Sequence, residues 1–233
     1  MKREVKNPAE RLIVALDFST PREALTLVDQ LSSHVSFFKI GLQLYTIAGP
    51  EIVREVTATG AKIFLDLKLH DIPNTVAKAV AAAGDLRVEM LTVHLSGGRK
   101  MLEAAVAAAP PELLLLGVTV LTSSDESTLQ ETGVSDSVAA QTLRLAQLGR
   151  TAGVNGLIAS PHELRSLRND LGECVTIITP GVRPAWAAAD DQKRFTSPAE
   201  AVRNGADYLV IGRPITAHKE PLEATRAIIA ELT

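Results

Sequence analysis

The segment AKIFLDLKLHDI, residues 61–72, joins an apolar run to three charged residues of alternating sign. The run from Ala61 to Leu65 predicts a buried β-strand. Because side chains alternate along a strand, Asp66 and Lys68 should share one face, with Asp71 just beyond the strand end. Charges at the tip of a core strand are costly to desolvate unless they pair or take part in chemistry. The segment therefore predicts either a structural ion-pair cluster or a catalytic site.

Similar apolar runs recur along the whole chain. The eight predicted strands are residues 12–16, 35–40, 61–65, 88–93, 113–121, 156–159, 175–178 and 208–211. Segments with helical patterns separate them, for example residues 22–31 and 73–83. Continuously apolar strands alternating with helices predict an α/β fold with a closed parallel sheet, a single (β/α)8 TIM barrel over residues 1–233. An open doubly wound sheet is the alternative, but no glycine-rich dinucleotide loop follows the first strand.

The composition argues against several classes of function. The 24 Lys and Arg against 27 Asp and Glu give a formal net charge of -3, which does not suit a general binder of nucleic acid or anionic membranes. Aromatic residues make up only 3% of the chain, which weakens any reading based on stacking against bases. The N-terminal apolar run is interrupted by Asp17, too early for a signal peptide, and no run approaches the length of a membrane span. We therefore expect a cytoplasmic protein that binds neither nucleic acid nor membrane.

The cysteine and histidines do not predict a metal site. Cys174 is the single cysteine, so neither a disulfide within the chain nor a cysteine metal cluster is expected. It lies beside the apolar run 175–178 and is expected to be a buried, small hydrophobic residue. We expect His94 to be a hydrogen-bonded core histidine rather than a catalytic one. Four other histidines lack metal-ligand spacing: His34, His70, His162 and His218.

Charged residues also end the two strands that precede residues 61–65. Asp17 follows the first strand, and the second contains Lys39. Neighbouring strands of a barrel lie about 4.8 Å apart, so these side chains should meet those of the third strand in one row of alternating charge. The expected row is Asp17, Lys39, Asp66 and Lys68, completed by Asp71. It lies at the C-terminal ends of the strands, where barrels of this type have their active sites.

A phosphate site is predicted after the last two strands, where this fold commonly binds phosphate. The sequence PGVRP, residues 180–184, follows the seventh strand, and IGRP, residues 211–214, includes the end of the eighth. Gly212 would let backbone N–H groups approach an anion. Arg183 or Arg213 could supply a bidentate guanidinium.

Two long irregular regions are predicted after strands, at residues 122–133 and 183–197. Loops that follow the strands of a barrel form its active face, so both regions are candidate lids or substrate clamps. Ser123 and Ser124 in the first of them lack the G-x-S-x-G pattern of a serine nucleophile.

Taken together, these motifs resemble the orotidine 5′-monophosphate decarboxylase family, in its bacterial, short single-domain type. The resemblance covers essentially the whole chain, in order, and shows no departure at a functional position. It rests on ALD at 15–17, KIG at 39–41, DLKLHDIPNT at 66–75, VLTS at 120–123, TPGVRP at 179–184, DQ at 191–192 and IGRP at 211–214. It implies a homodimeric barrel that converts orotidine 5′-monophosphate to UMP and CO2, the last step of de novo UMP synthesis, without a metal or organic cofactor.

The resemblance also implies roles for the matching residues. Lys68 would donate the proton to C6 of the pyrimidine, with Asp66, Asp71 and Lys39 completing the catalytic group. The substrate would be bound by Asp17, Lys39, Asp66, Ile72, Thr75, Thr122, Arg183, Gln192, Gly212 and Arg213. Three residues would enter the site of the partner subunit, so that catalysis would require the dimer: Asp71, Ile72 and Thr75.

The residue types make physical sense of that reaction. Loss of CO2 leaves a carbanion in the ring plane, and Lys68 can stabilise it as a cation and then protonate it. Two alternatives stay open. One is another decarboxylase or aldolase of the same barrel type that acts on a sugar phosphate, in some cases with Mg²⁺. The other is a catalytically silent phosphate-binding barrel.

Overall fold

The computed structural model describes residues 7–187 and 196–232, and in these residues eight parallel strands close into a barrel. The strands follow one another around the barrel in sequence order, and β8 pairs with β1 to close it. They are β1 (Leu12–Ala15), β2 (Phe37–Gly41), β3 (Lys62–Leu69), β4 (Met90–His94), β5 (Leu114–Val118), β6 (Gly156–Ile158), β7 (Thr176–Pro180) and β8 (Tyr208–Ile211). The predicted (β/α)8 barrel is confirmed, and the open doubly wound sheet is wrong.

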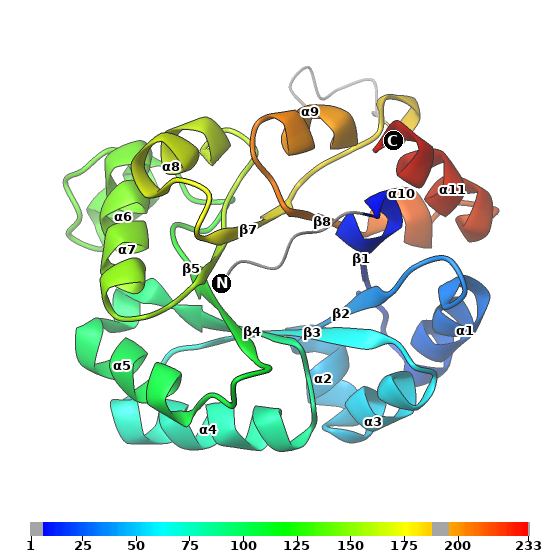
Figure 1. Cartoon of the computed structure of the whole chain (residues 1–233), viewed down its shortest axis with the longest axis horizontal. Helices are drawn as coiled ribbons and strands as arrows, with labels where there is room; N and C mark the ends of the chain where they lie inside the picture. Colours follow the sequence, from blue (N-terminus) through cyan, green and yellow to red (C-terminus); the bar gives the residue numbers. More distant parts are fainter. Residues whose placement is uncertain (1–6, 188–195, 233) are drawn as a thin grey trace.

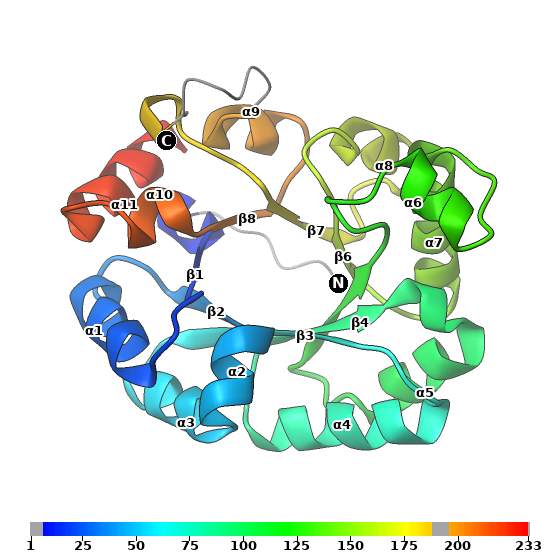
Figure 2. The same ribbon diagram turned by 180° about the vertical axis from the view of Figure 1, so that it is seen from behind.

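Helices surround the barrel in both views (Figure 1, Figure 2). The α-helices are α1 (Pro21–Leu31), α2 (Leu42–Ala48), α3 (Glu51–Ala58), α4 (Pro73–Asp85), α5 (Arg99–Ala108), α6 (Glu126–Glu131), α7 (Val138–Thr151), α8 (Leu164–Leu171), α9 (Pro198–Arg203), α10 (Arg213–Thr216) and α11 (Pro221–Glu231). Short 3-10 helices are η1 (Pro8–Arg11), η2 (Leu95–Gly97) and η3 (Ala185–Ala187). None of the described helices is long and apolar enough to cross a membrane, and the cytoplasmic location stays a prediction.

Apolar side chains fill two layers of the molecule. Ile13, Phe37 and Phe64 belong to the cluster inside the barrel. Leu12 and Val14 belong to the larger cluster between the strands and the helices. Successive residues of one strand thus enter different layers, because side chains alternate between its two faces. Both faces of the strands are buried over most of their length, which explains why the strands are mostly apolar in the sequence.

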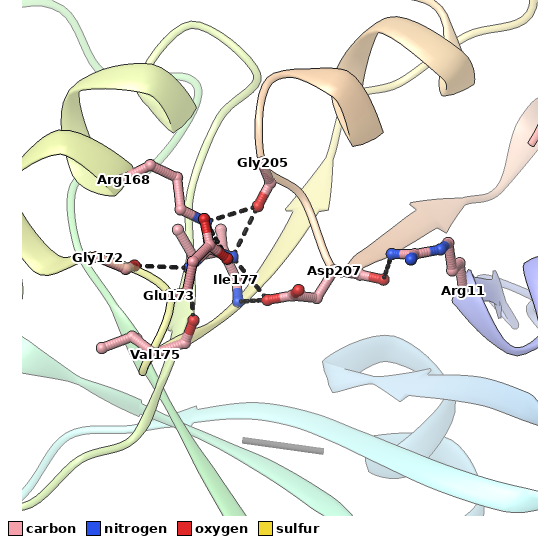
Figure 3. A network of polar contacts seen from close by, with 8 residues as sticks. All are labelled: Arg11, Arg168, Gly172, Glu173, Val175, Ile177, Gly205 and Asp207. Atoms are coloured by element: carbon pink, nitrogen blue, oxygen red, sulfur yellow. Dashed lines mark hydrogen bonds and ion pairs between the residues drawn. The ribbon is translucent and has the colours of Figure 1, made fainter. Parts of the chain in front are cut away.

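A buried arginine ties together the barrel end opposite the predicted site (Figure 3). Arg168 of α8 donates to Oδ2 of Asp207 at 2.7 Å, and to the carbonyls of Gly205 and Val175 at 2.7 Å each. Asp207 also accepts from the backbone N–H of Ile177 at 2.8 Å. Val175 and Asp207 lie immediately before β7 and β8, so the guanidinium fixes the N-terminal ends of both strands. This end of such barrels serves stability rather than catalysis.

Two expectations about local structure are wrong. Cys174 is exposed rather than buried, because β7 begins only at Thr176 and the cysteine lies in the turn before it. Residues 122–133, expected to be irregular, contain the helix α6. Asp125 caps that helix by accepting from the backbone N–H of Thr128 at 2.9 Å. Side-chain caps of this kind satisfy the free N–H groups at a helix start.

Candidate active site

Four of the predicted residues form a continuous row of ion pairs at the C-terminal ends of β1, β2 and β3. Nζ of Lys39 lies 3.0 Å from Oδ1 of Asp17 and 3.8 Å from Oδ2 of Asp66. Nζ of Lys68 lies 2.8 Å and 2.9 Å from the two carboxylate oxygens of Asp66. The structure therefore brings Asp17, Lys39, Asp66 and Lys68 together, with the carboxylate of Asp66 held between two ammonium groups.

The strand register explains this arrangement. Lys39 follows Phe37 by two residues on β2, and Asp66 follows Phe64 by two residues on β3. Both phenylalanines belong to the cluster inside the barrel. Since side chains two apart on a strand share a face, the charged groups lie one layer above the inner core. The side chains of Lys39 and Asp66 are only 11% and 13% exposed, so their attraction is weakly screened by water.

The backbone of Lys68 departs from a regular strand. Its φ angle is 50°, in the left-handed region that residues other than glycine rarely adopt. Leu65 pairs with Leu91 and Leu69 with Val93, so the register between β3 and β4 shifts across this stretch. Extra residues on one strand form a bulge, and bulges next to active sites re-aim side chains.

Thr92 is a residue of the site that the sequence reasoning missed. It lies on β4, is fully buried, and donates from Oγ1 to Oδ1 of Asp66 at 3.0 Å. The same oxygen accepts from the backbone N–H of Lys68 at 2.8 Å. A polar residue within the apolar strand Met90–His94 was the signal that could have found it.

His94 ends β4 beside the charge row instead of lying in the core as a hydrogen-bonded histidine. It is half-buried, and the centroid of its ring lies 5.5 Å from that of His70. Burial is the main cause that lowers the pKa of His94, and the proximity of His70 and Lys68 lowers it further. Burial favours the uncharged form of a histidine.

The residues predicted to bind phosphate lie after β7 and β8. Arg183 is half-buried, and its backbone N–H donates to the carbonyl of Thr196 at 3.1 Å. Arg213 is exposed and begins α10. A Cβ placed on Gly212 would lie 3.8 Å from Oδ2 of Asp17, so the loop after β8 adjoins the charge row.

The other predicted residues do not join this cluster within the described part of the chain. Thr122, Asp71, Ile72 and Thr75 are exposed, and the side chain of Ile72 is 65% exposed. The carboxylate of Asp71 accepts from the backbone N–H of Ile72 and makes no ion pair with another described residue. Gln192, with Asp191, lies outside the described residues.

The expectation that no metal is needed stays a prediction. Among residues 7–187 and 196–232, no group of three or more His, Cys, Asp and Glu side chains is arranged to hold a metal ion.

The charge row lies at the C-terminal ends of the strands, where barrel enzymes have their active sites, and the loops after the last two strands of such barrels frequently bind phosphate. Residues 10–228 match the sequence model described as the Orotidine 5'-phosphate decarboxylase / HUMPS family, and the chain belongs to that family. It is 54% identical over 224 residues to the orotidine 5'-phosphate decarboxylase of Opitutus terrae, and this match covers 95% of this chain and 97% of the relative. It is 48% identical over 228 residues to that of Geotalea daltonii, with 95% of each chain covered.

Solved structures agree with this result. The crystal structure of orotidine 5'-phosphate decarboxylase from Lactobacillus acidophilus has a TM-score of 0.85 and 35% sequence identity. The match covers 96% of this chain and 99% of the other. The resemblance predicted from the motifs is confirmed at the level of the family.

Proposed function

We propose that this chain converts orotidine 5′-monophosphate to UMP and CO2, the last step of de novo UMP synthesis. Membership of the family and the names of the relatives at 54% and 48% identity support the proposal. The observation that carries it is the contact between Lys68 and Asp66. An ammonium group lies 2.8 Å and 2.9 Å from the two oxygens of one carboxylate, at the mouth of a barrel.

Lys68 supplies the charge and the proton that the reaction needs. When CO2 leaves C6, the lone pair that stays behind lies in the plane of the pyrimidine, where the π system cannot delocalise it directly. A cation fixed beside C6 stabilises this developing carbanion, because a preorganised charge needs no rearrangement during the reaction. The same ammonium group then donates a proton to C6 as a general acid.

Asp66 acts on the substrate and on Lys68. Its carboxylate orients the ammonium group, because both of its oxygens accept from Nζ of Lys68. It also crowds the carboxylate of the substrate, and two like charges ~4 Å apart repel by about 4 kcal/mol at an effective dielectric constant of about 20. This repulsion disappears when CO2 departs. We assign the larger effect to stabilisation of the carbanion, because preorganised electrostatics is usually the largest contribution.

The remaining contacts hold the nucleotide. Asp17 and Lys39 bind the ribose hydroxyls, and Thr122 lies against the edge of the pyrimidine. The phosphate is bound by four residues after β7 and β8: Arg183, Gln192, Gly212 and Arg213. The short distance from the Gly212 position to Asp17 supports a substrate that spans the two regions. Contacts with the remote phosphate then contribute binding energy to loop closure and to the chemical step.

We further propose that the active form is a homodimer in which Asp71, Ile72 and Thr75 enter the site of the partner subunit. In the single chain these residues are exposed, and the large apolar side chain of Ile72 is 65% exposed. The carboxylate of Asp71 contacts only the backbone N–H of Ile72 among the described residues.

The test is an assay of orotidine 5′-monophosphate consumption by ultraviolet absorbance, in the presence of EDTA. The wild-type protein should turn over the nucleotide without added metal, and Lys68→Ala should abolish turnover while still binding UMP. Lys62→Ala is the matched control. Lys62 begins the same strand, and its Nζ lies 5.3 Å from the centroid of the Phe37 ring. Loss of this side chain should leave turnover unchanged.

Other outcomes select the alternatives. Turnover of a sugar phosphate, but not of the nucleotide, on addition of Mg²⁺ would favour the related decarboxylase or aldolase. Binding of UMP without turnover of either substrate would favour a silent phosphate-binding barrel. Turnover by a pure Lys68→Ala preparation would contradict the role of Lys68 as proton donor.

A further inference from the structure

We infer that Thr92 is a positioning residue for the decarboxylation, which fixes Lys68 and Asp66 relative to each other. The inference rests on the proposed function and adds a residue to its machinery. Thr92 lies in the middle of β4 with no exposed surface, so the substrate meets it only through the two charged residues that it holds.

The hydroxyl of Thr92 joins the two charged residues in a closed ring of contacts. It accepts from the backbone N–H of Lys68 at 2.8 Å and donates to Oδ1 of Asp66 at 3.0 Å. The same Oδ1 accepts from Nζ of Lys68 at 2.8 Å. Lys68 is thereby held at both its backbone and its ammonium group. A hydroxyl has one proton and accepts through its lone pairs, so both functions of this group are in use.

The same hydroxyl supports the unusual backbone of Lys68. The left-handed conformation at φ 50° is unfavourable for a residue with a side chain, and such conformations persist where the surroundings over-determine them. Residues 66–68 stand opposite Thr92 alone, because Leu65 pairs with Leu91 and Leu69 with Val93. The backbone N–H of Lys68 lies where the register shifts, and the hydroxyl of Thr92 is the acceptor of its hydrogen bond.

Valine at position 92 would keep the shape of the side chain and remove both hydrogen bonds. The N–H of Lys68 would lose its acceptor and Asp66 one of its donors, so the bulge would be free to relax. A displacement of about 1 Å at a reacting group can reduce the rate about 100-fold. We expect kcat of Thr92→Val to fall by about that factor. Binding of UMP should stay within about threefold, since ribose and phosphate contacts do not involve position 92.

Two further variants separate positioning from a general loss of stability. Thr92→Ser keeps the hydroxyl and should restore kcat to within about threefold of the wild type. Thr225→Val is the matched control: Thr225 is also fully buried, and its hydroxyl donates to the carbonyl of Pro221 at 2.8 Å, in the helix α11. It should lower the unfolding midpoint without changing kcat. Thr92→Ala removes the same hydroxyl and replaces Thr92→Val if the valine variant folds poorly.

Comparison of the single variants distinguishes failure of this inference from failure of the proposed function. If Lys68→Ala retains activity, the role of Lys68 is wrong. If Lys68→Ala is inactive but Thr92→Val turns over like Thr225→Val, the positioning role alone is overturned.

Discussion

Gly212 and Asp17 are neighbours across the seam where the barrel closes: a Cβ on Gly212 would lie 3.8 Å from Oδ2 of Asp17 and 3.4 Å from Cβ of Ala15. The loop that follows the last strand thus adjoins the residue that follows the first. One elongated ligand can reach the charge row at one end and the arginines after β7 and β8 at the other. A nucleotide with its phosphate on the ribose has this shape and charge.

Removal of Arg213 should impair the reaction through the phosphate. A hydrogen bond to a charged group contributes about 1.5–3 kcal/mol. We therefore expect kcat/KM of Arg213→Ala for orotidine 5′-monophosphate to fall roughly 10- to 150-fold. With phosphate-free orotidine the loss should be small, because that substrate never uses the contact.

The control for this experiment is Arg203→Ala, which removes an exposed arginine of α9. It should leave kcat/KM for both substrates unchanged. Equal fractional losses of Arg213→Ala with nucleotide and nucleoside would show that Arg213 does not act through the phosphate.

Mixed dimers test whether Asp71 crosses to the partner subunit. Lys68→Ala and Asp71→Ala homodimers should each be inactive or badly impaired. After subunit exchange about half of the dimers are mixed. In each mixed dimer, one of the two sites combines Lys68 of one chain with Asp71 of the other. Roughly a quarter of all sites are then intact, so activity should rise to about that fraction of the wild type.

A second mixture provides the matched control. Lys68 and Asp66 contact each other within one chain, so mixing Lys68→Ala with Asp66→Ala creates no intact site. Its activity should stay at background after exchange. If exchange is verified by mass and the Lys68→Ala and Asp71→Ala mixture also stays at background, Asp71 serves its own subunit.

The fold could be predicted from the sequence because the barrel buries both faces of each strand. Ile13 and Val14 enter different apolar layers, and such burial leaves a continuous apolar run in the sequence. The positions of Lys39 and Asp66 followed from the same alternation of side chains. The ends of the strands were less predictable. The strand β3 continues through Asp66 and Lys68 to Leu69, because the two side chains form an ion pair and the backbone N–H of Lys68 donates to Thr92.

Features that depend on contacts between distant residues could not be predicted. Nothing in the sequence near Lys68 indicates a left-handed backbone, since its support comes from Thr92 on the next strand. The exposure of Cys174 depends on where β7 begins, which an adjacent apolar run does not specify. The environment of His94 depends on His70, which approaches from the loop after β3.

Removal of Arg168 should destabilise the barrel without changing its chemistry. The side chains of Arg168 and Asp207 are only 9% and 12% exposed, and loss of one partner of a buried ion pair typically costs about 3–5 kcal/mol. Arg168→Met should lower the free energy of urea unfolding by about that amount. The kcat at 25 °C (about 298 K) should stay unchanged, because the network lies at the end opposite the charge row.

Arg165→Met is the matched control on the same helix. Arg165 donates to Oδ1 of Asn204 at 2.9 Å in an exposed position, so its loss should change stability by about 0.5 kcal/mol or less. Equal effects of the two variants would contradict the assignment of Arg168 as the residue that fixes the ends of β7 and β8.

The lowered pKa of His94 predicts a pH-dependent stability. Burial lowers this pKa below its ordinary value of about 6.5, while Asp66 opposes the shift. At pH values between the lowered pKa of His94 in the folded chain and about 6.5, the unfolded chain binds more protons at this residue than the folded chain does. The contribution of His94 to stability is therefore present above about 6.5 and is lost as the pH falls below that value.

Unfolding midpoints in urea measured at about pH 7 and about pH 5.5 check this prediction. The decrease between the two pH values should be smaller in His94→Gln than in the wild type. His162→Gln, a change at an exposed histidine after β6, should show the wild-type decrease. An identical decrease in all three proteins would show that His94 does not contribute to the acid sensitivity.

The pairing of β1 with β8 also constrains when the protein can acquire its site during synthesis. A domain folds as a unit while the ribosome delivers its chain from the N-terminus. Until residues 208–212 have emerged, β1 and β7 remain unpaired sheet edges, and such edges are prone to pairing with other chains. Asp17 is synthesised long before Gly212, the residue that it adjoins in the folded barrel. An unfinished chain that lacks residues 208–212 therefore offers the nucleotide no complete site.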